Sequence, residues 1–317
     1  MNKESGTLPI AVLIPCYNEE KTIAKVVRDF RAILPEAGIF VFDNNSTDRT
    51  ADLAHSEGAM VIKEKRQGKG FVVSSMFDKI VAEYYLMVDG DDTYPADVAE
   101  GMIEILKNEE ADIVVANRLE SYHYTRVRPF HHLGNKLVRF LINLSFSARI
   151  KDPMSGYRAF TYEAITALPF LSTGFEIETE LTVQALFRRL KIKEIDIIYR
   201  DRPKGSYSKL KTFSDGWSVL VTIFMLLKAY KPMTFFGLIG FIFFFSGLAS
   251  GWVAVKEFLS AGSSFQLPLS IFAGLLILAG FIFAVTGIII HTINYRILEA
   301  SNISLKLMKH MRKSRER

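Results

Sequence analysis

The sequence predicts an α/β domain with a mostly parallel, Rossmann-like central sheet, then amphipathic interface helices and a C-terminal two-helix transmembrane hairpin. Three observations support this prediction. Short apolar runs alternate with helix-type periodicity up to residue 116, polar clusters follow four of these runs, and two segments, 233–255 and 269–292, contain no Asp, Glu, Lys or Arg. Alternating strands and helices are typical of parallel, doubly wound sheets.

The predicted strands are the apolar runs. After the first run, 10–14, apolar residues at 23, 26, 27 and 30 recur at helical spacing. Further strands are predicted at 39–42, 60–62, 85–88 and 112–116, with helices that begin near Thr47, near Lys69 and after Pro95. In sheets of this kind, ligands bind beyond the carboxyl ends of the strands.

Polar clusters follow the strands at those ends. PCYNEE follows the first strand, DNNSTD the second, DGDD the fourth, and Asn117-Arg118 the fifth. We therefore expect the four clusters to share one crevice. PCYNEE contains no glycine, which argues against a dehydrogenase because a dinucleotide site needs G-x-G-x-x-G in the first turn.

Asp89 and Asp91 predict a metal site. Two carboxylates about 5 Å apart repel each other by roughly 0.8 to 3 kcal/mol, so a cation is expected between them. Mg²⁺ or Mn²⁺ fits, because such ions take one or two carboxylates plus substrate phosphates. A solvated acidic turn is the alternative, but the neighbouring polar turns favour the metal. Asp43 is expected to accept from a base N–H, and Lys69 to contact a phosphate or a base carbonyl.

The two uncharged segments predict a membrane hairpin. The first has 23 residues, and a helix of that length spans the ~30 Å hydrocarbon layer. Two core helices of a large soluble domain are the alternative. The residues after Ser304 carry six Lys or Arg against one Glu. Two crossings leave both chain ends on one side, so the positive-inside tendency predicts a multi-pass cell-membrane protein whose α/β domain is cytoplasmic.

These features divide the chain into four predicted parts: an α/β domain (1–209), an amphipathic interface helix (210–231), two membrane helices (232–293) and a basic tail (294–317). A second amphipathic stretch, 129–150, fits either the membrane interface or packing on the α/β domain. The basic tail and the formal net charge of +5 fit anionic lipid better than nucleic acid. The single cysteine, Cys16, excludes an internal disulfide and a Cys-based zinc site.

Six short motifs follow one another along the chain: IPCYNEE, DNNSTDRT, QGKG, MVDGDDTYP, DPMSGYR and RPKGSYSKL. Together they resemble inverting family 2 glycosyltransferases of the GT-A fold. The likeness is strongest to polyprenyl-phosphate glycosyltransferases, which include dolichyl-phosphate mannose synthases and the GtrB-type glucosyltransferases with two C-terminal spans. It covers about residues 8–210 by motif and the rest by topology.

The resemblance implies a donor-nucleotide site at the strand-end turns, made by Pro15, Tyr17, Asn18, Glu19, Asp43, Asp89 and Gly90. Asp89 and Asp91 would hold Mg²⁺ or Mn²⁺ and the donor diphosphate. Dolichyl-phosphate mannose synthases commonly read Asp-Ala-Asp-Leu-Gln at this turn, whereas this chain has Asp92 and Thr93. The sequence therefore departs from the family at the third metal ligand.

Basic and hydroxyl side chains after residue 117 predict an acceptor-phosphate site, because Arg and Lys bind phosphate. They are Arg118, Ser155, Arg158, Arg202, Ser208 and Lys209, with Arg126 and Arg128 added from the sequence alone. Asp152 is expected to take part in catalysis by orienting these cations or the sugar. Glu176, Glu178 and Glu180 fit either sugar contacts or helix N-terminal acids.

The resemblance implies transfer of a hexose to polyprenyl phosphate on the cytoplasmic leaflet, and the likeness of the two C-terminal spans to GtrB-type enzymes favours UDP-glucose as donor. A phosphate monoester is mainly a dianion at pH 7 and attacks without a base. The alternatives are a GDP-mannose-dependent mannose synthase, a processive polysaccharide synthase and a non-catalytic scaffold. QALFRRL lacks the Gln-x-x-Arg-Trp of processive synthases, and both aspartates of the D-x-D are retained, which speaks against a scaffold. The resemblance also suggests a homo-oligomer.

Overall fold

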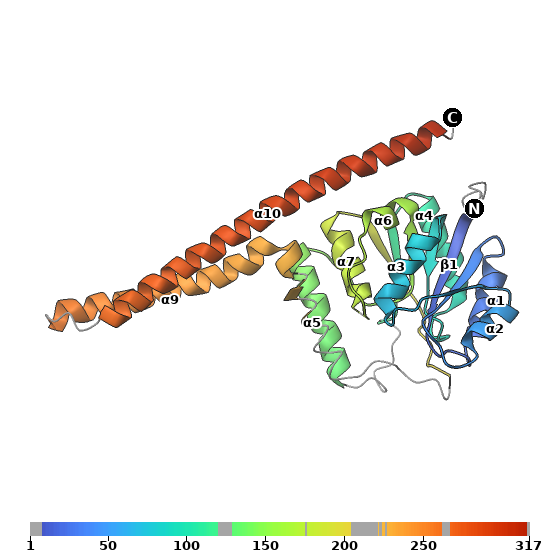
Figure 1. Cartoon of the computed structure of the whole chain (residues 1–317), viewed down its shortest axis with the longest axis horizontal. Helices are drawn as coiled ribbons and strands as arrows, with labels where there is room; N and C mark the ends of the chain where they lie inside the picture. The colour runs from blue at the N-terminus through green and yellow to red at the C-terminus, as the bar shows by residue number, and fades with distance from the viewer. Residues whose placement is uncertain are drawn as a thin grey trace. The chain divides into compact units, whose positions relative to one another are not determined.

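The computed structural model describes residues 8–119, 129–174, 176–203, 221, 224–225, 227–261 and 267–315. The chain forms two compact units, Met1–Thr222 and Ile223–Arg317. The first unit contains the sheet and its covering helices, and the second contains two long helices (Figure 1).

The first unit is built on a seven-stranded sheet with the order β3-β2-β1-β4-β6-β5-β7. The β6 strand runs antiparallel to β4 and β5, and the other pairs are parallel. The mostly parallel sheet is therefore confirmed, and each of the five predicted strands is present. The strands are β1 (Leu8–Cys16), β2 (Gly38–Asp43), β3 (Met60–Lys63), β4 (Ala82–Met87), β5 (Ile113–Asn117), β6 (Arg158–Thr161) and β7 (Ile192–Asp196).

Helices cover both faces of the sheet (Figure 1). One hydrophobic cluster includes α1 (Ile23–Ile33), α2 (Thr50–Ser56) and α4 (Ala99–Lys107), which follows the short 3₁₀ turn η1 (Ala96–Val98). The other includes α3 (Lys69–Lys79), α6 (Tyr162–Ala167) and α7 (Ile177–Phe187). The side chains of β1 alternate between the two clusters. This burial on both faces explains why the strand is a continuous apolar run.

The α5 helix (Pro129–Phe146) has two different faces. Val138 and Ile142 are buried, whereas Leu137, Phe140 and Leu144 are exposed. The amphipathic pattern predicted for 129–150 is therefore present, and its apolar residues divide between a packed face and an exposed face.

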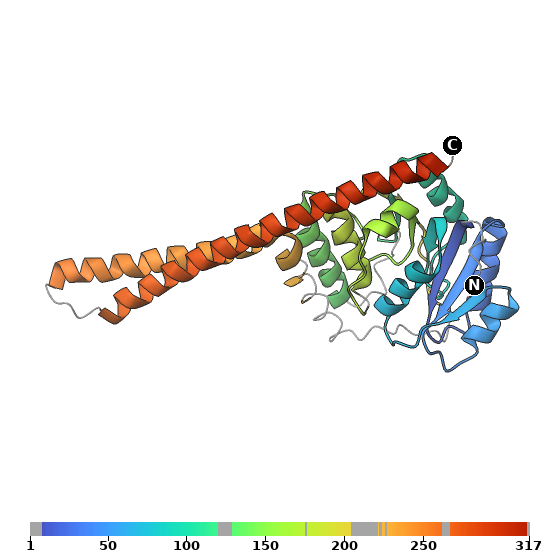
Figure 2. The same ribbon diagram turned by 45° about the horizontal axis from the view of Figure 1, so that its top comes forward.

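The second unit consists of α9 (Pro232–Ala261) and α10 (Leu267–Arg315), which run side by side in opposite directions (Figure 2). Within the described residues, Pro232–Ser260 and Leu267–Ala300 are long and apolar enough to cross a membrane. Both helices extend past the predicted spans, and α10 continues through the predicted basic tail as far as Arg315.

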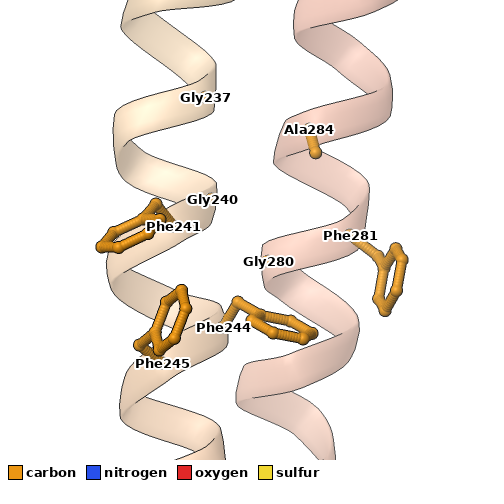
Figure 3. Close-up of a pocket in the computed structure, with 8 residues that line it drawn as sticks. All are labelled: Gly237, Gly240, Phe241, Phe244, Phe245, Gly280, Phe281 and Ala284. Atoms are coloured by element: carbon orange, nitrogen blue, oxygen red, sulfur yellow. The ribbon is translucent and has the colours of Figure 1, made fainter.

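Glycines allow the two long helices to approach closely. A Cβ on Gly280 would lie 2.9 Å from the carbonyl oxygen of Gly240, and one on Gly240 would lie 2.8 Å from that of Gly280. In Figure 3, Phe244 points toward α10 beside Gly280, whereas Phe241 points away from it. Small residues at a helix crossing let backbones pack directly, as is common in membranes.

The substitution Gly280→Leu is expected to push α9 and α10 apart. Interaxial distances of packed helices vary between about 8 and 10 Å with the side chains at the contact, so a widening of roughly 1 to 2 Å is expected. Spin labels at the exposed positions Trp252 and Ile271 would report it by pulsed EPR. Gly274→Leu is the control, because a Cβ there meets nothing within 4 Å. Equal label distances in both variants would contradict the prediction.

Candidate active site

The turns after β1, β2 and β4 lie at one edge of the sheet, as predicted. Cys16 is paired with Asp43 in the β1–β2 register, and Leu13 with Met87 in the β1–β4 register. The ladder continues one step into the turns, because the N–H of Asn44 donates to the carbonyl of Cys16 at 2.9 Å. The strand register therefore fixes the three turns relative to one another.

Hydrogen bonds join the first two turns. The N–H of Asn18 donates to Ser46 Oγ at 2.9 Å, and Asn18 Oδ1 accepts from the N–H of Thr47 at 2.8 Å. The N–H of Glu19 donates to Thr50 Oγ1 at 2.7 Å. Asn18 has a φ of 54°, a left-handed conformation that Asn tolerates. The predicted residues Asn18 and Glu19 therefore form one rigid element with the second turn.

The other predicted nucleoside residues line the same region. Pro15 is the last residue but one of β1 and pairs with Phe42. Asp43 is buried and accepts from the N–H of Ser46 at 3.2 Å, and Tyr17 is 38% exposed. A buried carboxylate and an exposed aromatic side chain in neighbouring turns provide a hydrogen-bond acceptor and a stacking surface for a flat, polar ligand.

The Asp-x-Asp turn after β4 gathers cations. Asp89 Oδ1 lies 2.7 Å from Lys69 Nζ, and Asp91 Oδ2 lies 2.6 Å from a terminal guanidinium nitrogen of Arg202. Thr93 Oγ1 donates to Asp91 Oδ1 at 2.6 Å. Thr93, one of the two residues at which this turn departs from the mannose synthase pattern, therefore fixes the orientation of Asp91.

Gly90 is required between the two aspartates because of close packing. A Cβ at this position would lie 2.6 Å from Cys16 Sγ. The carbonyl of Gly90 accepts from Thr22 Oγ1 at 2.7 Å, which joins the turn to the beginning of α1. The close packing on Cys16 and the hydrogen bond from Thr22 therefore fix the backbone between Asp89 and Asp91.

The carboxylates fit a divalent cation that also binds a ligand phosphate. Among the described residues, no group of three or more His, Cys, Asp or Glu side chains could hold a metal ion. Asp89 and Asp91 supply two carboxylates, and Mg²⁺ or Mn²⁺ is commonly held by one or two carboxylates together with substrate phosphates. These two carboxylates therefore suit a divalent ion whose other ligands include the oxygens of a diphosphate.

Lys69 begins α3 in a turn that packs tightly on another loop. A Cβ on Gly70 would lie 2.0 Å from the carbonyl oxygen of Ser172, and one on Gly68, whose φ is 139°, would lie 2.3 Å from that of Thr173. The Lys69 side chain also contacts Glu178 at 2.5 Å. Burial disfavours the ammonium, but the two carboxylates outweigh this effect and raise the pKa of Lys69. Lys69 therefore stays charged.

The substitution Gly70→Ala is expected to destabilise the first unit, because backbone atoms block the added methyl group. Overpacking of this kind costs about 1 to 3 kcal/mol, which thermal unfolding would detect. Gly101→Ala in α4 is the control, because a Cβ there meets nothing within 4 Å and alanine favours helix. An unchanged unfolding temperature for Gly70→Ala would contradict the prediction.

A second group of predicted residues follows β5. Arg118 Nε donates to Asp152 Oδ2 at 3.0 Å, and its terminal nitrogen donates to the carbonyl of Met154 at 2.8 Å. Burial disfavours the charged form of Arg118, but Asp152 together with Tyr94, Tyr199 and Glu178 outweighs this effect and raises the pKa of the guanidinium. The guanidinium carbon lies 5.9 Å from the centre of the Tyr199 ring. Asp152 therefore orients Arg118, one of the two roles predicted for it.

Arg158 and Ser155 lie inside the protein. Arg158 is 1% exposed and donates to the carbonyls of Pro153 and Ser155, each at 2.8 Å. Ser155 is fully buried. A Cβ on Gly156 would lie 2.5 Å from Asp89 Oδ2, so this loop packs on the Asp-x-Asp turn. Arg158 therefore supports the loop that contains Pro153 and Ser155 by bonding to its carbonyls. Phosphate binding by Arg158 or Ser155 stays a prediction.

The remaining predicted residues divide into two groups. Arg202 reaches Asp91, as described above. The other four, Arg126, Arg128, Ser208 and Lys209, lie outside the described residues.

The sequence analysis missed Glu194, which accepts from the N–H groups of Lys151 and Asp152 at 2.8 and 2.9 Å. Burial raises the pKa of this carboxyl. The two isoleucines of IKEID are three residues apart, so the local pattern gave no signal that Glu194 lies in a strand.

The three glutamates at the N-terminal end of α7 have separate partners: Glu176 precedes the helix, and Glu178 and Glu180 lie in its first turn. Glu180 accepts from the N–H groups of Leu171 and Ser172 at 3.2 and 2.7 Å, and Glu176 accepts from that of Gly174 at 3.1 Å. Both act as acids at a helix N-terminus, which is one of the two predicted roles. Glu178 instead contacts Lys69.

A mostly parallel sheet with an Asp-x-Asp turn after β4, next to the joined turns of β1 and β2, defines a glycosyltransferase domain of the GT-A fold. Residues 11–168 match the sequence profile of Glycosyl transferase family 2. The chain is 30% identical to Glycosyltransferase AglJ of Haloferax volcanii, over 95% of this chain and 98% of that protein. The chain belongs to glycosyl transferase family 2, and the predicted enzyme class, a hexosyltransferase, is confirmed.

Two further comparisons are informative. The Dolichyl-phosphate hexose transferase of Haloferax volcanii is 28% identical over 66% of this chain and 90% of that protein. The solved structure of glucosyl-3-phosphoglycerate synthase from Mycobacterium tuberculosis, in complex with Mn²⁺, UDP-glucose and phosphoglyceric acid, matches with a TM-score of 0.55. It is 21% identical and covers 69% of this chain and 79% of that chain, so this likeness concerns the fold.

Proposed function

We propose that this enzyme transfers a hexose, with inversion, from a nucleotide sugar to the phosphate of a polyprenyl lipid at the cytoplasmic face of the cell membrane. The observation that carries the proposal is the placement of Arg202 on Asp91, which brings a phosphate-binding side chain to the Asp-x-Asp turn. The name of the similar dolichyl-phosphate hexose transferase supports the acceptor, and the two candidate spans support a lipid substrate.

The donor would lie over the first three strand ends. Tyr17 and Asp43 would contact the nucleoside, and Asp89 and Asp91 would hold Mg²⁺ or Mn²⁺. When bound, this ion would neutralise charge on the departing nucleoside diphosphate. The fold neighbour crystallised with Mn²⁺ and UDP-glucose supports this choice of metal and donor. Lys69, charged and fixed beside Asp89, adds a further cation near the leaving group.

The acceptor phosphate would supply the nucleophile itself. Its dianion needs no base to remove a proton. The carboxylates that a hydroxyl acceptor would need as a base are already engaged, because Asp152 pairs with Arg118 and Glu178 with Lys69. Arg118 and Arg202 would bind the phosphate oxygens and align one of them with the anomeric carbon.

Three features support the proposed membrane arrangement. The α9 and α10 helices would span the bilayer, and the basic end of α10 would lie on the cytoplasmic side. The exposed Leu137, Phe140 and Leu144 of α5 would rest in the interface, as amphipathic helices do. The homo-oligomer suggested by the family resemblance belongs to this proposal as well.

The donor is tested by incubating the full chain and Mn²⁺ with polyprenyl phosphate and one radiolabelled donor at a time: UDP-glucose, UDP-galactose or GDP-mannose. We expect lipid-soluble label from UDP-glucose. Label from GDP-mannose alone would identify a mannose synthase, and polymer in the aqueous phase would identify a processive synthase. No transfer from any donor would favour a non-catalytic scaffold.

A further inference from the structure

Glu178 differs in its contacts from Glu176 and Glu180, the other two glutamates at the N-terminal end of α7. Glu176 and Glu180 accept backbone N–H groups of the segment before the helix. Glu178 is buried, and its carboxylate lies 2.5 Å from the ammonium of Lys69. It is therefore placed to act on the Asp-x-Asp turn through Lys69.

Lys69 is held from two directions. The backbone is fixed where Gly70 donates to the carbonyl of Thr173 at 3.1 Å. The side chain is fixed between Asp89 at 2.7 Å and Glu178 at 2.5 Å. A buried ion pair adds little net stability, because desolvation cancels much of the attraction. Its position beside Asp89 therefore indicates a role in the site.

We propose that Glu178 is a positioning residue of the donor site, which holds the Lys69 ammonium between α7 and Asp89 so that Lys69 does not exclude a divalent cation from Asp89. This inference rests on the proposed function, which places a divalent cation and a diphosphate at that turn. Lys69 then remains available to the diphosphate as a fixed positive charge.

The physical basis is competition for one carboxylate. The ammonium of Lys69 and a divalent cation both attract the oxygens of Asp89. With Glu178 in place, Lys69 divides its interaction between two carboxylates. When glutamine replaces Glu178, Lys69 pairs more strongly with Asp89, and the metal must displace it. Loss of the Glu178 charge should therefore weaken metal binding.

The test is Mn²⁺ binding to the full chain in detergent with saturating UDP, measured from the EPR signal of the free ion. Glu178→Gln keeps the shape of the side chain and removes its charge, and the Kd for Mn²⁺ is expected to rise about tenfold. Glu176→Gln is the matched control. It removes an equal charge from the same end of α7 and keeps an oxygen for the N–H of Gly174, so its Kd is expected within about twofold of wild type.

A Lys69→Met background separates positioning from simple charge loss. In that background, Glu178→Gln is expected to change the Kd less than about twofold, because the two residues act as one unit. A tenfold rise in both backgrounds, or an unchanged Kd for Glu178→Gln in the native background, would overturn the inference.

Two further results keep the test decisive. Glu178→Asp retains the charge at a greater distance from Lys69 and should give an intermediate Kd, which serves if Glu178→Gln folds poorly. Failure of the wild-type chain to bind Mn²⁺ with UDP would overturn the proposed function together with this inference. Normal wild-type binding with an unaffected Glu178→Gln variant would overturn this inference alone.

Discussion

Replacing Asp91 with asparagine is expected to reduce sugar transfer at least about a thousandfold, since a bound metal stabilises transition-state charge by several kcal/mol. Asparagine keeps an oxygen for the hydroxyl of Thr93, which now donates to Asp91 at 2.6 Å, so the turn should keep its conformation. The loss would then reflect the missing charge. Initial rates of radiolabelled transfer, with thermal unfolding as the folding check, measure it.

Asp92→Asn is the matched control for this variant. Asp92 is the neighbouring carboxylate, and it pairs at 2.7 Å with Lys25, whose side chain is exposed. Its removal costs a surface ion pair, which contributes about 0 to 1 kcal/mol, and transfer should stay within about threefold of wild type. Similar rates for the Asp91 variant and the wild type would contradict the assignment of Asp91 to the metal.

The substitution Arg202→Ala is expected to raise the KM for polyprenyl phosphate between about 10-fold and 100-fold, since a hydrogen bond to a charged group contributes roughly 1.5 to 3 kcal/mol. Mn²⁺ affinity should move in the opposite direction. Arg202 now occupies Asp91 Oδ2 at 2.6 Å, and its loss frees that oxygen for the metal. Steady-state kinetics with varied lipid, together with Mn²⁺ titration, separate the two effects.

Arg200 offers a control on the same segment. Its side chain lies 4.0 Å from Asp92, and its N–H donates to the carbonyl of Thr93 at 2.9 Å. Arg200→Ala keeps the backbone bond and removes an exposed charge, so the KM for the lipid should change by less than about threefold. A larger KM effect for Arg200→Ala than for Arg202→Ala would contradict the assignment of Arg202 to the acceptor.

The sequence predicted the part of the fold that depends on burial. The first five strands are apolar runs, and β1 is packed on both faces. Two strands were not predicted. The β6 strand has only four residues and begins with the buried Arg158, and β7 reads IKEID, with no apolar run. Short or polar strands gain their stability from neighbours that a local pattern does not reveal.

The site was predictable where strand ends determine it, and less so where distant segments meet. The register of parallel strands brings the turns near Asp43 and Asp89 together, so their grouping followed from the strand order. Contacts between distant segments have no local signal. Lys69 was predicted to contact a ligand phosphate or base, but its pairing with Asp89 and Glu178 was not expected. The burial of Arg158 was not predicted either, because it also depends on contacts between distant segments.

The central claim is that the phosphate of the lipid is the nucleophile, and comparison of two acceptors tests it most directly. Purified full chain with Mn²⁺ and a labelled nucleotide sugar is given either polyprenyl phosphate or the matching polyprenol, which lacks the phosphate. We predict label in the polyprenyl phosphate product alone, with an inverted anomeric configuration by NMR. Comparable transfer to the polyprenol, or retention of configuration, would contradict it.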